Sequence, residues 1–147
     1  MSRMKSIVVT GASRGIGRDL SEFLIKKNYF VFGCSRGKSD LTHSNYRHFC
    51  VDVTSESQVT KMFGEISKDE SQLYGLVNSA GIASMNHTFL TPSSTVDRVF
   101  SVNFKGTFNC SKGAAKLMKN FKNGRIVNFS TIAVPICLEG EAIYAAS

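Results

Sequence analysis

Apolar residues along the chain fall into two patterns, short continuous runs and stripes with helical spacing. The runs are typical of strands buried in a sheet, and they cover residues 5–9, 29–34, 46–51, 73–78 and 125–129. The stripes predict helices over residues 15–27, over a segment through Val59 and Ile66, from Thr91 to about Asn120, and from Ile143 onward.

Two of these helices carry start signals. Ser55 and Gln58 have the spacing of a capping box, in which each side chain bonds the other residue's backbone. Thr91 followed by Pro92 predicts an N-cap with proline at the first helical position. In the helix that starts there, four apolar residues are expected to face inward: Val96, Val99, Phe100 and Phe104.

The order of these elements predicts an α/β fold: a Rossmann-type, doubly wound parallel sheet with helices on both faces, in one domain over residues 1–147. The chain between Cys34 and Tyr46 lacks a helical pattern, so a loop is expected to connect those two strands. Ligands of such sheets bind at the carboxyl ends of the strands. Polar or glycine-rich clusters follow the predicted strands, and we expect them to line one edge: Gly11–Gly17, Ser35-Arg36, Asp52, Asn78–Gly81 and Ser130-Thr131.

Composition narrows the class of protein. A length of 147 residues with 42% apolar residues suits one globular domain, and no run approaches the roughly 18 apolar residues of a membrane span. The N-terminus leads straight into a strand without a signal-peptide pattern. The four cysteines are widely spread, and the three histidines (His43, His48 and His87) form no ligand spacing. We therefore expect free thiols, a reducing, cytoplasmic location and no metal site.

The net charge of +7 admits nucleic-acid binding as an alternative. The basic residues are scattered, however, and no basic run has interleaved aromatic residues, so no nucleic-acid partner is predicted. A basic surface suits a polyanionic nucleotide cofactor equally well.

The stretch from Thr10 to Gly17 links the first strand to the first helix through three glycines. Gly11 permits a tight turn, Gly15 lets backbone N–H groups approach a pyrophosphate, and Gly17 lets the helix pack close to the sheet. The spacing Gly-x-x-x-Gly-x-Gly differs from the common dinucleotide fingerprint, and no Gly-Lys-Ser/Thr completes a P-loop. A glycine-rich turn without a ligand remains the alternative.

With four further features, this stretch resembles the short-chain dehydrogenase/reductase family, of the 3-oxoacyl-[acyl-carrier-protein] reductase type. The other features are Asp52-Val53, Asn78-Ser-Ala-Gly81, Val102-Asn103, and Tyr144 in Ile-Tyr-Ala-Ala-Ser. The resemblance implies an NADP(H) cofactor, with Ser13, Arg14 and Ile16 at its phosphates and ribose. Ser35-Arg36 stands where NAD-preferring members carry an acid, so Arg36 and Arg14 are expected to bind the 2′-phosphate. The alternative is that Arg36 is a solvated turn residue.

The resemblance further implies that Asp52 and Val53 hold the adenine and that Asn78, Ala80 and Gly81 lie against the cofactor ribose. Ser79 departs from the usual second asparagine of that motif.

Four residues are the expected catalytic group: Tyr144, Thr131, Asn103 and Ser130. The resemblance makes Tyr144 the general acid that protonates a carbonyl oxygen, and it places Asn103 in a proton relay. Thr131 lies thirteen residues before Tyr144, at the family's serine position, and Ser130 is kept as its alternative. The family's lysine, four residues after the tyrosine, would lie beyond Ser147. An exposed helical residue is the alternative for Asn103.

The predicted activity is hydride transfer between nicotinamide and a ketone or secondary alcohol. The resemblance to the 3-oxoacyl-[acyl-carrier-protein] reductase type, through Gly-Arg-Ile-Val-Asn and Tyr-Ala-Ala-Ser, implies a 3-oxoacyl thioester as substrate, which a carrier protein would present. Family members reach roughly 250 residues, a one-domain size, so we expect a chain truncated just after the tyrosine and, at full length, a homo-oligomer. The alternative is a catalytically inactive nucleotide-binding fragment or pseudo-enzyme.

Overall fold

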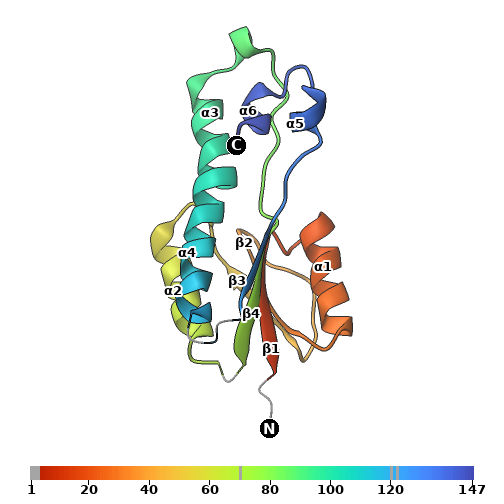
Figure 1. Cartoon of the computed structure of the whole chain (residues 1–147), viewed down its shortest axis with the longest axis vertical. Helices are drawn as coiled ribbons and strands as arrows, with labels where there is room; N and C mark the ends of the chain where they lie inside the picture. The colour runs from red at the N-terminus through yellow and green to blue at the C-terminus, as the bar shows by residue number, and fades with distance from the viewer. Residues whose placement is uncertain (1–3, 70, 120, 122) are drawn as a thin grey trace.

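The computed structural model describes residues 4–69, 71–119, 121 and 123–147, and these confirm the predicted parallel sheet (Figure 1). Five strands pair in parallel in the order β3-β2-β1-β4-β5. Their bounds are β1 (Lys5–Thr10), β2 (Phe30–Ser35), β3 (Tyr46–Cys50), β4 (Gln72–Asn78) and β5 (Arg125–Asn128). The chain order reverses direction across the sheet between β1 and β4, which is where such sheets bind ligands.

Helices cover both faces of the sheet. The helix α1 (Gly15–Lys26) lies on one face, and α2 (Glu56–Ile66) and α4 (Thr107–Met118) lie on the other (Figure 1). Ahead of α4, the helix α3 (Ser93–Phe100) continues through η2 (Ser101–Gly106), a π-helical turn. Beyond the carboxyl ends of the strands lie η1 (Thr88–Leu90), α5 (Ala133–Ile136) and α6 (Ala142–Ala145).

Both predicted helix starts differ in detail from the structure. The Ser55 side chain accepts a bond from the backbone N–H of Gln58, but the Gln58 side chain accepts from the N–H of Asp52, so the capping box is only half formed. Helix α3 begins at Ser93, with Pro92 in the capping position that was predicted for Thr91. A proline side chain cannot accept a hydrogen bond, and the Thr91 hydroxyl donates to the carbonyl of His87 instead.

The prediction that Phe104 faces inward is wrong. Val99 is buried as expected, whereas Phe104 is 63% exposed. The π-helical turn has i→i+5 bonds, so residues after Ser101 rotate out of the α-helical register. Gly106 and Cys110 occupy the inward positions. The sequence predicts that the helix starting near Thr91 ends at about Asn120, and that residue lies outside the described part of the chain.

The connection from β2 to β3 is a loop, as predicted, with no helix between Ser35 and Tyr46. Leu41 from this loop packs with Tyr46 against the apolar cluster beneath α1. The side chain of Leu41 therefore attaches the middle of this crossover loop to the core.

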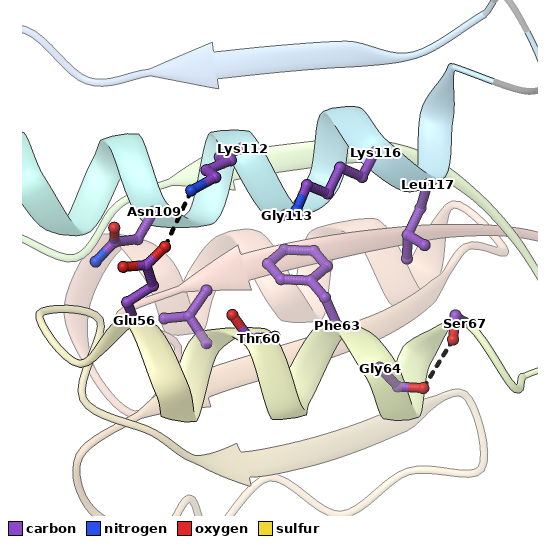
Figure 2. A pocket seen from close by; sticks show the side chains of 11 residues that line it. Glu56, Thr60, Phe63, Gly64, Ser67, Asn109, Lys112, Gly113, Lys116 and Leu117 are labelled. Atoms are coloured by element: carbon purple, nitrogen blue, oxygen red, sulfur yellow. Dashed lines mark hydrogen bonds and ion pairs between the residues drawn. The ribbon is translucent and has the colours of Figure 1, made fainter.

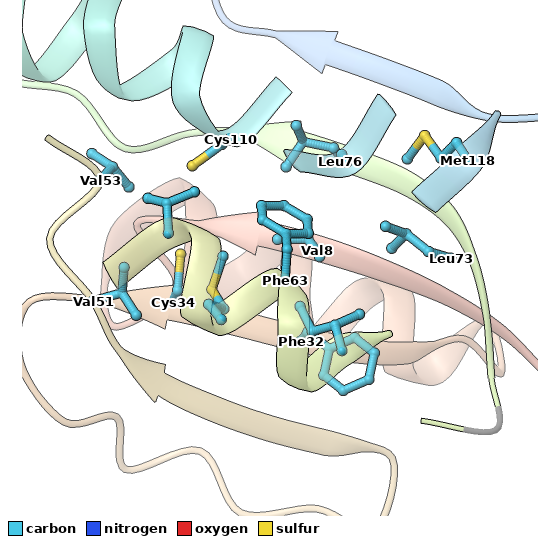
Figure 3. Packing of buried hydrophobic residues seen from close by; sticks show 14 residues of the cluster. Val8, Phe32, Cys34, Val51, Val53, Phe63, Leu73, Leu76, Cys110 and Met118 are labelled. Atoms are coloured by element: carbon cyan, nitrogen blue, oxygen red, sulfur yellow. The ribbon is translucent and has the colours of Figure 1, made fainter. Parts of the chain in front are cut away.

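The larger apolar cluster lies between the sheet and the helices α2 and α4 (Figure 3). Phe32, Leu76 and Cys110 are fully buried there, and Phe63 extends from α2 across the cluster. Gly113 of α4 lies so close to the Phe63 ring that a Cβ at this position would overlap it. Among the described residues, none of the helices has the length and apolar character needed to cross a membrane.

Two glycines on the facing helices predict opposite effects of the same substitution. Gly113→Ala is expected to lower the free energy of unfolding by about 1–2 kcal/mol, because the added methyl overpacks the core against Phe63. Gly64→Ala is the matched control, since its Cβ would enter open space and alanine favours the helix by about 1 kcal/mol. Urea denaturation of both variants measures the difference. Stabilisation by Gly113→Ala would contradict the close α2–α4 contact.

Candidate functional site

The carboxyl ends of the five parallel strands bring the predicted segments to one edge of the sheet. The glycine turn follows β1, Ser35-Arg36 ends β2, and Asp52 follows β3. Asn78 ends β4, and Ser130-Thr131 follows β5. Residues that are far apart in the sequence therefore share this edge, as the strand pattern predicts.

The glycine turn has the backbone geometry that an anion-binding turn requires. Gly11 and Gly15 have φ values of +70° and +53°, which side chains other than glycine rarely adopt. A Cβ at Gly17 would overlap the carbonyl group of Gly11, so the first turn of α1 packs directly against the end of β1. Apart from its chain neighbours and the backbone of α1, none of the described residues lies within 4 Å of the position a Gly15 Cβ would take, which leaves the backbone at the helix start accessible.

Exposed groups surround this turn. Arg14 precedes α1 in the capping position without a side-chain capping bond, and Ile16 is 60% exposed. Ser13 is half-buried beside them. The helix start thus combines the first backbone N–H groups of α1, which have no intrahelical partner, with a guanidinium group, a combination that suits a phosphate.

The Thr10 hydroxyl joins the glycine turn to the segment after β4. Its Oγ1 accepts bonds from the backbone N–H of Ser79 at 3.0 Å and of Ala80 at 2.9 Å. A Cβ on Gly11 would lie 3.0 Å from Ala80, so the two segments touch. Thr10 was not among the predicted site residues. The signal that identifies it is a hydroxyl residue directly after the apolar run Ile7-Val8-Val9, where burial demands hydrogen-bond partners.

The end of β2 presents positive charge without a competing acid. Ser35 donates from its hydroxyl to the carbonyl of Gly37 at 2.8 Å, and Arg36 between them is exposed. The first acid further along the loop is Asp40, which forms an ion pair with Arg18 of α1. The hydrogen bond from Arg18 holds the pKa of the Asp40 carboxyl below its usual range.

The segment after β3 is fixed from two sides. Asp52 Oδ1 accepts from the backbone N–H and the hydroxyl of Thr54 at 2.9 and 2.8 Å. The carbonyl of Val53 accepts a 3.0 Å bond from Asn109 Nδ2 in α4. A Cβ on Gly106 would lie 2.6 Å from the Val53 side chain, so this segment packs tightly against the long helix.

The Asn78 side chain points into the protein. Its Nδ2 donates to Ser111 Oγ at 3.1 Å and to Asn128 Oδ1 at 2.8 Å, which ties β4 to α4 and β5. Any contact of residue 78 with a ligand at the sheet edge is therefore left to its backbone, whereas Ala80 and Gly81 lie at the edge itself.

Asn103 lies in the π-helical turn and connects two segments of the candidate catalytic group. Its Oδ1 accepts from the N–H of Ile82 at 2.9 Å, and its Nδ2 donates to the Ile82 carbonyl at 3.0 Å. The same Nδ2 lies 2.8 Å from Ser147 Oγ, which donates to the carbonyl of Tyr144 at 2.9 Å. This amide is part of a network and is not a solvated surface side chain. Single π-turns of this kind are frequent at functional sites.

Tyr144 and Thr131 both lie beyond the carboxyl ends of the strands, in separate segments of the chain. Tyr144 is a half-buried residue of α6, and Thr131 precedes α5. The Thr131 Oγ1 accepts from the N–H of Ala133 at 3.1 Å, which leaves its own proton to donate. Ser130 beside it is exposed. No hydrogen bond among the described residues links Tyr144 to either hydroxyl.

A pocket of about 230 Å³ lies elsewhere, between α2 and α4 (Figure 2). Phe63, Gly64 and Gly113 line its floor, and Lys112 bonds to Glu56 at 3.0 Å across one end. None of the predicted site residues lines it. The candidate site is therefore the group of residues at the carboxyl edge of the sheet, and not this pocket.

Two buried cysteines, Cys34 and Cys110, are unsuited to act as nucleophiles, because their thiols resist losing the proton. Burial raises the pKa of the Cys34 thiol well above its usual range and that of Cys110 to about 12. Cys50 and Cys137 are exposed, and all four cysteines are free thiols.

Comparison with known proteins identifies related sequences. A family model described as short chain dehydrogenase matches residues 5–147. The 3-oxoacyl-[acyl-carrier-protein] reductase FabG of Staphylococcus aureus is 32% identical over 157 residues, covering 100% of this chain and 64% of that protein. The NADPH-dependent aldehyde reductase 2 of Arabidopsis thaliana is 33% identical over 164 residues, covering 95% of this chain and 60% of that protein.

Solved structures agree with these matches. The ligand-free aldohexose dehydrogenase of Thermoplasma acidophilum superposes with a TM-score of 0.91 at 30% identity, covering 98% of this chain and 56% of that one. ElxO with NADP bound superposes with a TM-score of 0.89 at 28% identity, covering 99% and 62%. The chain thus spans less than two thirds of the length of these relatives.

Replacing Thr10 tests the link between the glycine turn and the segment after β4. Thr10→Val keeps the shape but removes the oxygen that accepts from two N–H groups. Leaving two part-buried donors unpaired is expected to lower the free energy of unfolding by about 1–3 kcal/mol. Thr10→Ser keeps the oxygen and is the matched control. Equal stability of the two variants in urea denaturation would refute the link.

Proposed function

The chain belongs to the short-chain dehydrogenase family, and within this family we propose that it is an NADPH-dependent reductase of ketones. The observation that carries the proposal is the glycine turn at the sheet edge, flanked by Arg14 and Arg36 with no acid at the end of β2. The NADP-bound state of ElxO and the name of the Arabidopsis reductase support this cofactor.

The residues at the turn fit a dinucleotide diphosphate. Gly15 places no side chain in the space before α1, and the first N–H groups of the helix supply donors for phosphate oxygens. Ser13 and Ile16 flank this space, and Gly17 brings the helix close to the sheet. Because Gly11 contacts Ala80, the cofactor ribose can lie against the backbone of Ala80 and Gly81.

The ends of β2 and β3 suit the adenosine part of NADPH. Arg36 and Arg14 offer planar donors that bind a 2′-phosphate in bidentate fashion. Ser35 closes the base of this subsite through its bond to Gly37. Asp52 and Val53 are assigned to the adenine, with the second carboxylate oxygen of Asp52 as the acceptor for its amino group.

The nicotinamide supplies hydride when the cofactor is bound. Tyr144 donates its phenolic proton to the carbonyl oxygen of the substrate, and the Thr131 hydroxyl donates a hydrogen bond that polarises the same carbonyl. Ser130 is the alternative donor. Asn103 holds the tyrosine in place through Ser147 and the carbonyl of Tyr144.

The substrate and the assembly state are proposals for the whole protein. The name of the Staphylococcus aureus relative supports a 3-oxoacyl thioester presented by a carrier protein, and the name of the Arabidopsis relative supports an aldehyde. A homo-oligomer and a reducing, cytoplasmic location are further parts of the proposal, the latter supported by the four free thiols.

The cofactor assignment predicts a discriminating titration. The purified protein is expected to bind NADPH at least about tenfold more tightly than NADH, and Arg36→Ala to weaken NADPH binding about ten- to a hundredfold through loss of charge-assisted bonds. Arg47→Ala is the control, because that guanidinium pairs with Glu65. Tighter binding of NADH, or no effect of Arg36→Ala, would overturn the assignment.

The proposed role of Tyr144 as proton donor predicts a loss of activity that is separate from cofactor binding. Tyr144→Phe is expected to lower the rate of NADPH oxidation with a reactive ketone at least about a hundredfold, while NADPH affinity stays unchanged. Tyr74→Phe, at the other end of the sheet beside Lys5, is the control. If the unaltered protein binds NADPH but turns over no member of a ketone and 3-oxoacyl thioester panel, the inactive nucleotide-binding module holds instead.

A further inference from the structure

His48 forms a hydrogen-bonded network behind the end of β2. Its Nε2 lies 3.0 Å from the carbonyl oxygen of Gly37 and 3.0 Å from Ser35 Oγ. Its Nδ1 lies 2.8 Å from the hydroxyl of Tyr46. The imidazole thus contacts both neighbours of Arg36 in the chain, although it belongs to another strand.

The partners assign the proton on the ring. A carbonyl can only accept, so Nε2 carries the hydrogen that points to Gly37. Nδ1 is then an acceptor for the Tyr46 hydroxyl. Burial raises the pKa of Tyr46, so its hydroxyl keeps the proton that it donates. Ser35 donates to the same Gly37 carbonyl, and its oxygen can share the His48 proton.

Tyr46 reaches this position because β2 has a glycine beneath it. A Cβ on Gly33 would overlap the phenol of Tyr46. The ring therefore lies across β2, and it packs, as Leu41 of the crossover loop does, against the apolar cluster beneath α1. The loop is fastened at a second point, where Asp40 pairs with Arg18 of α1. Arg36 thus lies between Ser35 and Gly37, which contact His48, and the chain is attached again further along at Asp40.

We propose that His48 is a positioning residue for recognition of the cofactor's 2′-phosphate. It fixes the carbonyl of Gly37 and the hydroxyl of Ser35, so the backbone that carries Arg36 is ordered before the nucleotide binds. The inference rests on the proposed NADPH function and goes beyond it. In this proposal His48 contacts the loop that carries Arg36 and does not contact the nucleotide itself.

Preorganisation explains why this matters for specificity. A loop that is already ordered does not lose conformational freedom when the phosphate binds, so more of the interaction appears as affinity. Only ligands with a 2′-phosphate use this loop. Loss of His48 therefore weakens NADPH and leaves NADH binding, which depends on the glycine turn, unchanged.

The test compares two small nucleotides by calorimetry on the purified protein. The probes are 2′,5′-ADP and 5′-AMP, which differ only in the 2′-phosphate. His48→Ala is expected to weaken binding of 2′,5′-ADP about tenfold, the factor that corresponds to the loss of one or two hydrogen bonds, and to leave binding of 5′-AMP unchanged. His48→Gln, whose amide can donate to Gly37, is expected to restore most of the difference. His43→Ala, which replaces an exposed histidine of the loop between β2 and β3, is the control.

Tyr46→Phe gives an independent measurement should His48→Ala fail to fold. It keeps the ring over Gly33 and removes the donor to Nδ1. We expect a several-fold higher KM for NADPH, an unchanged kcat and an unchanged KM for NADH.

The outcomes separate the two claims. If the unaltered protein does not prefer 2′,5′-ADP over 5′-AMP, the proposed NADPH function falls, and this inference falls with it. If that preference is present and both His48→Ala and Tyr46→Phe retain it, His48 is not a positioning residue while the NADPH function stands. Equal weakening of both probes overturns the inference as well, because it indicates general damage to the fold.

Discussion

The close approach of α1 to the end of β1 is the contact on which the rest of the site depends. Gly17 packs against the Gly11 carbonyl at a distance that leaves no room for a side chain. This contact aims the start of the helix at the sheet edge and leaves an accessible backbone at Gly15. A larger residue at position 17 would overlap the Gly11 carbonyl and push the start of α1, with its free N–H groups, away from the end of β1.

Three of the segments at the sheet edge are each held by a polar side chain from another element. Thr10 holds the segment after β4, Asn109 holds the segment after β3, and His48 holds the end of β2. Asn103 joins the loop at Ile82 to the helix that carries Tyr144. Because loops have few apolar contacts, such bonds supply the order that a binding site needs. The site is thus a set of loops fastened to a rigid sheet.

The fold was predictable from the sequence, because buried parallel strands give continuous apolar runs and amphipathic helices give a clear period. The orientation of Phe104 was not, since it depends on a π-helical turn that an ideal period of 3.6 residues does not anticipate. The start of α3 was predicted one residue too early. Threonine is a better capping residue than proline, so the sequence favours Thr91, yet Pro92 occupies the capping position in the structure.

The position of the candidate residues at one edge followed from strand order alone, but their hydrogen-bond partners did not. Nothing in the sequence pairs His48 with Gly37 or Asn103 with Ile82, because these bonds join residues brought together only by the folded sheet. Thr10 lay within the predicted motif, yet its role appears only once the segment after β4 is seen to rest on it.

A crystal structure of the protein with NADPH tests the central claim most directly. The account predicts the diphosphate at the backbone N–H groups between Gly15 and Gly17, and the 2′-phosphate between Arg14 and Arg36. A nucleotide seated in the pocket between α2 and α4, or bound away from the glycine turn, would contradict it.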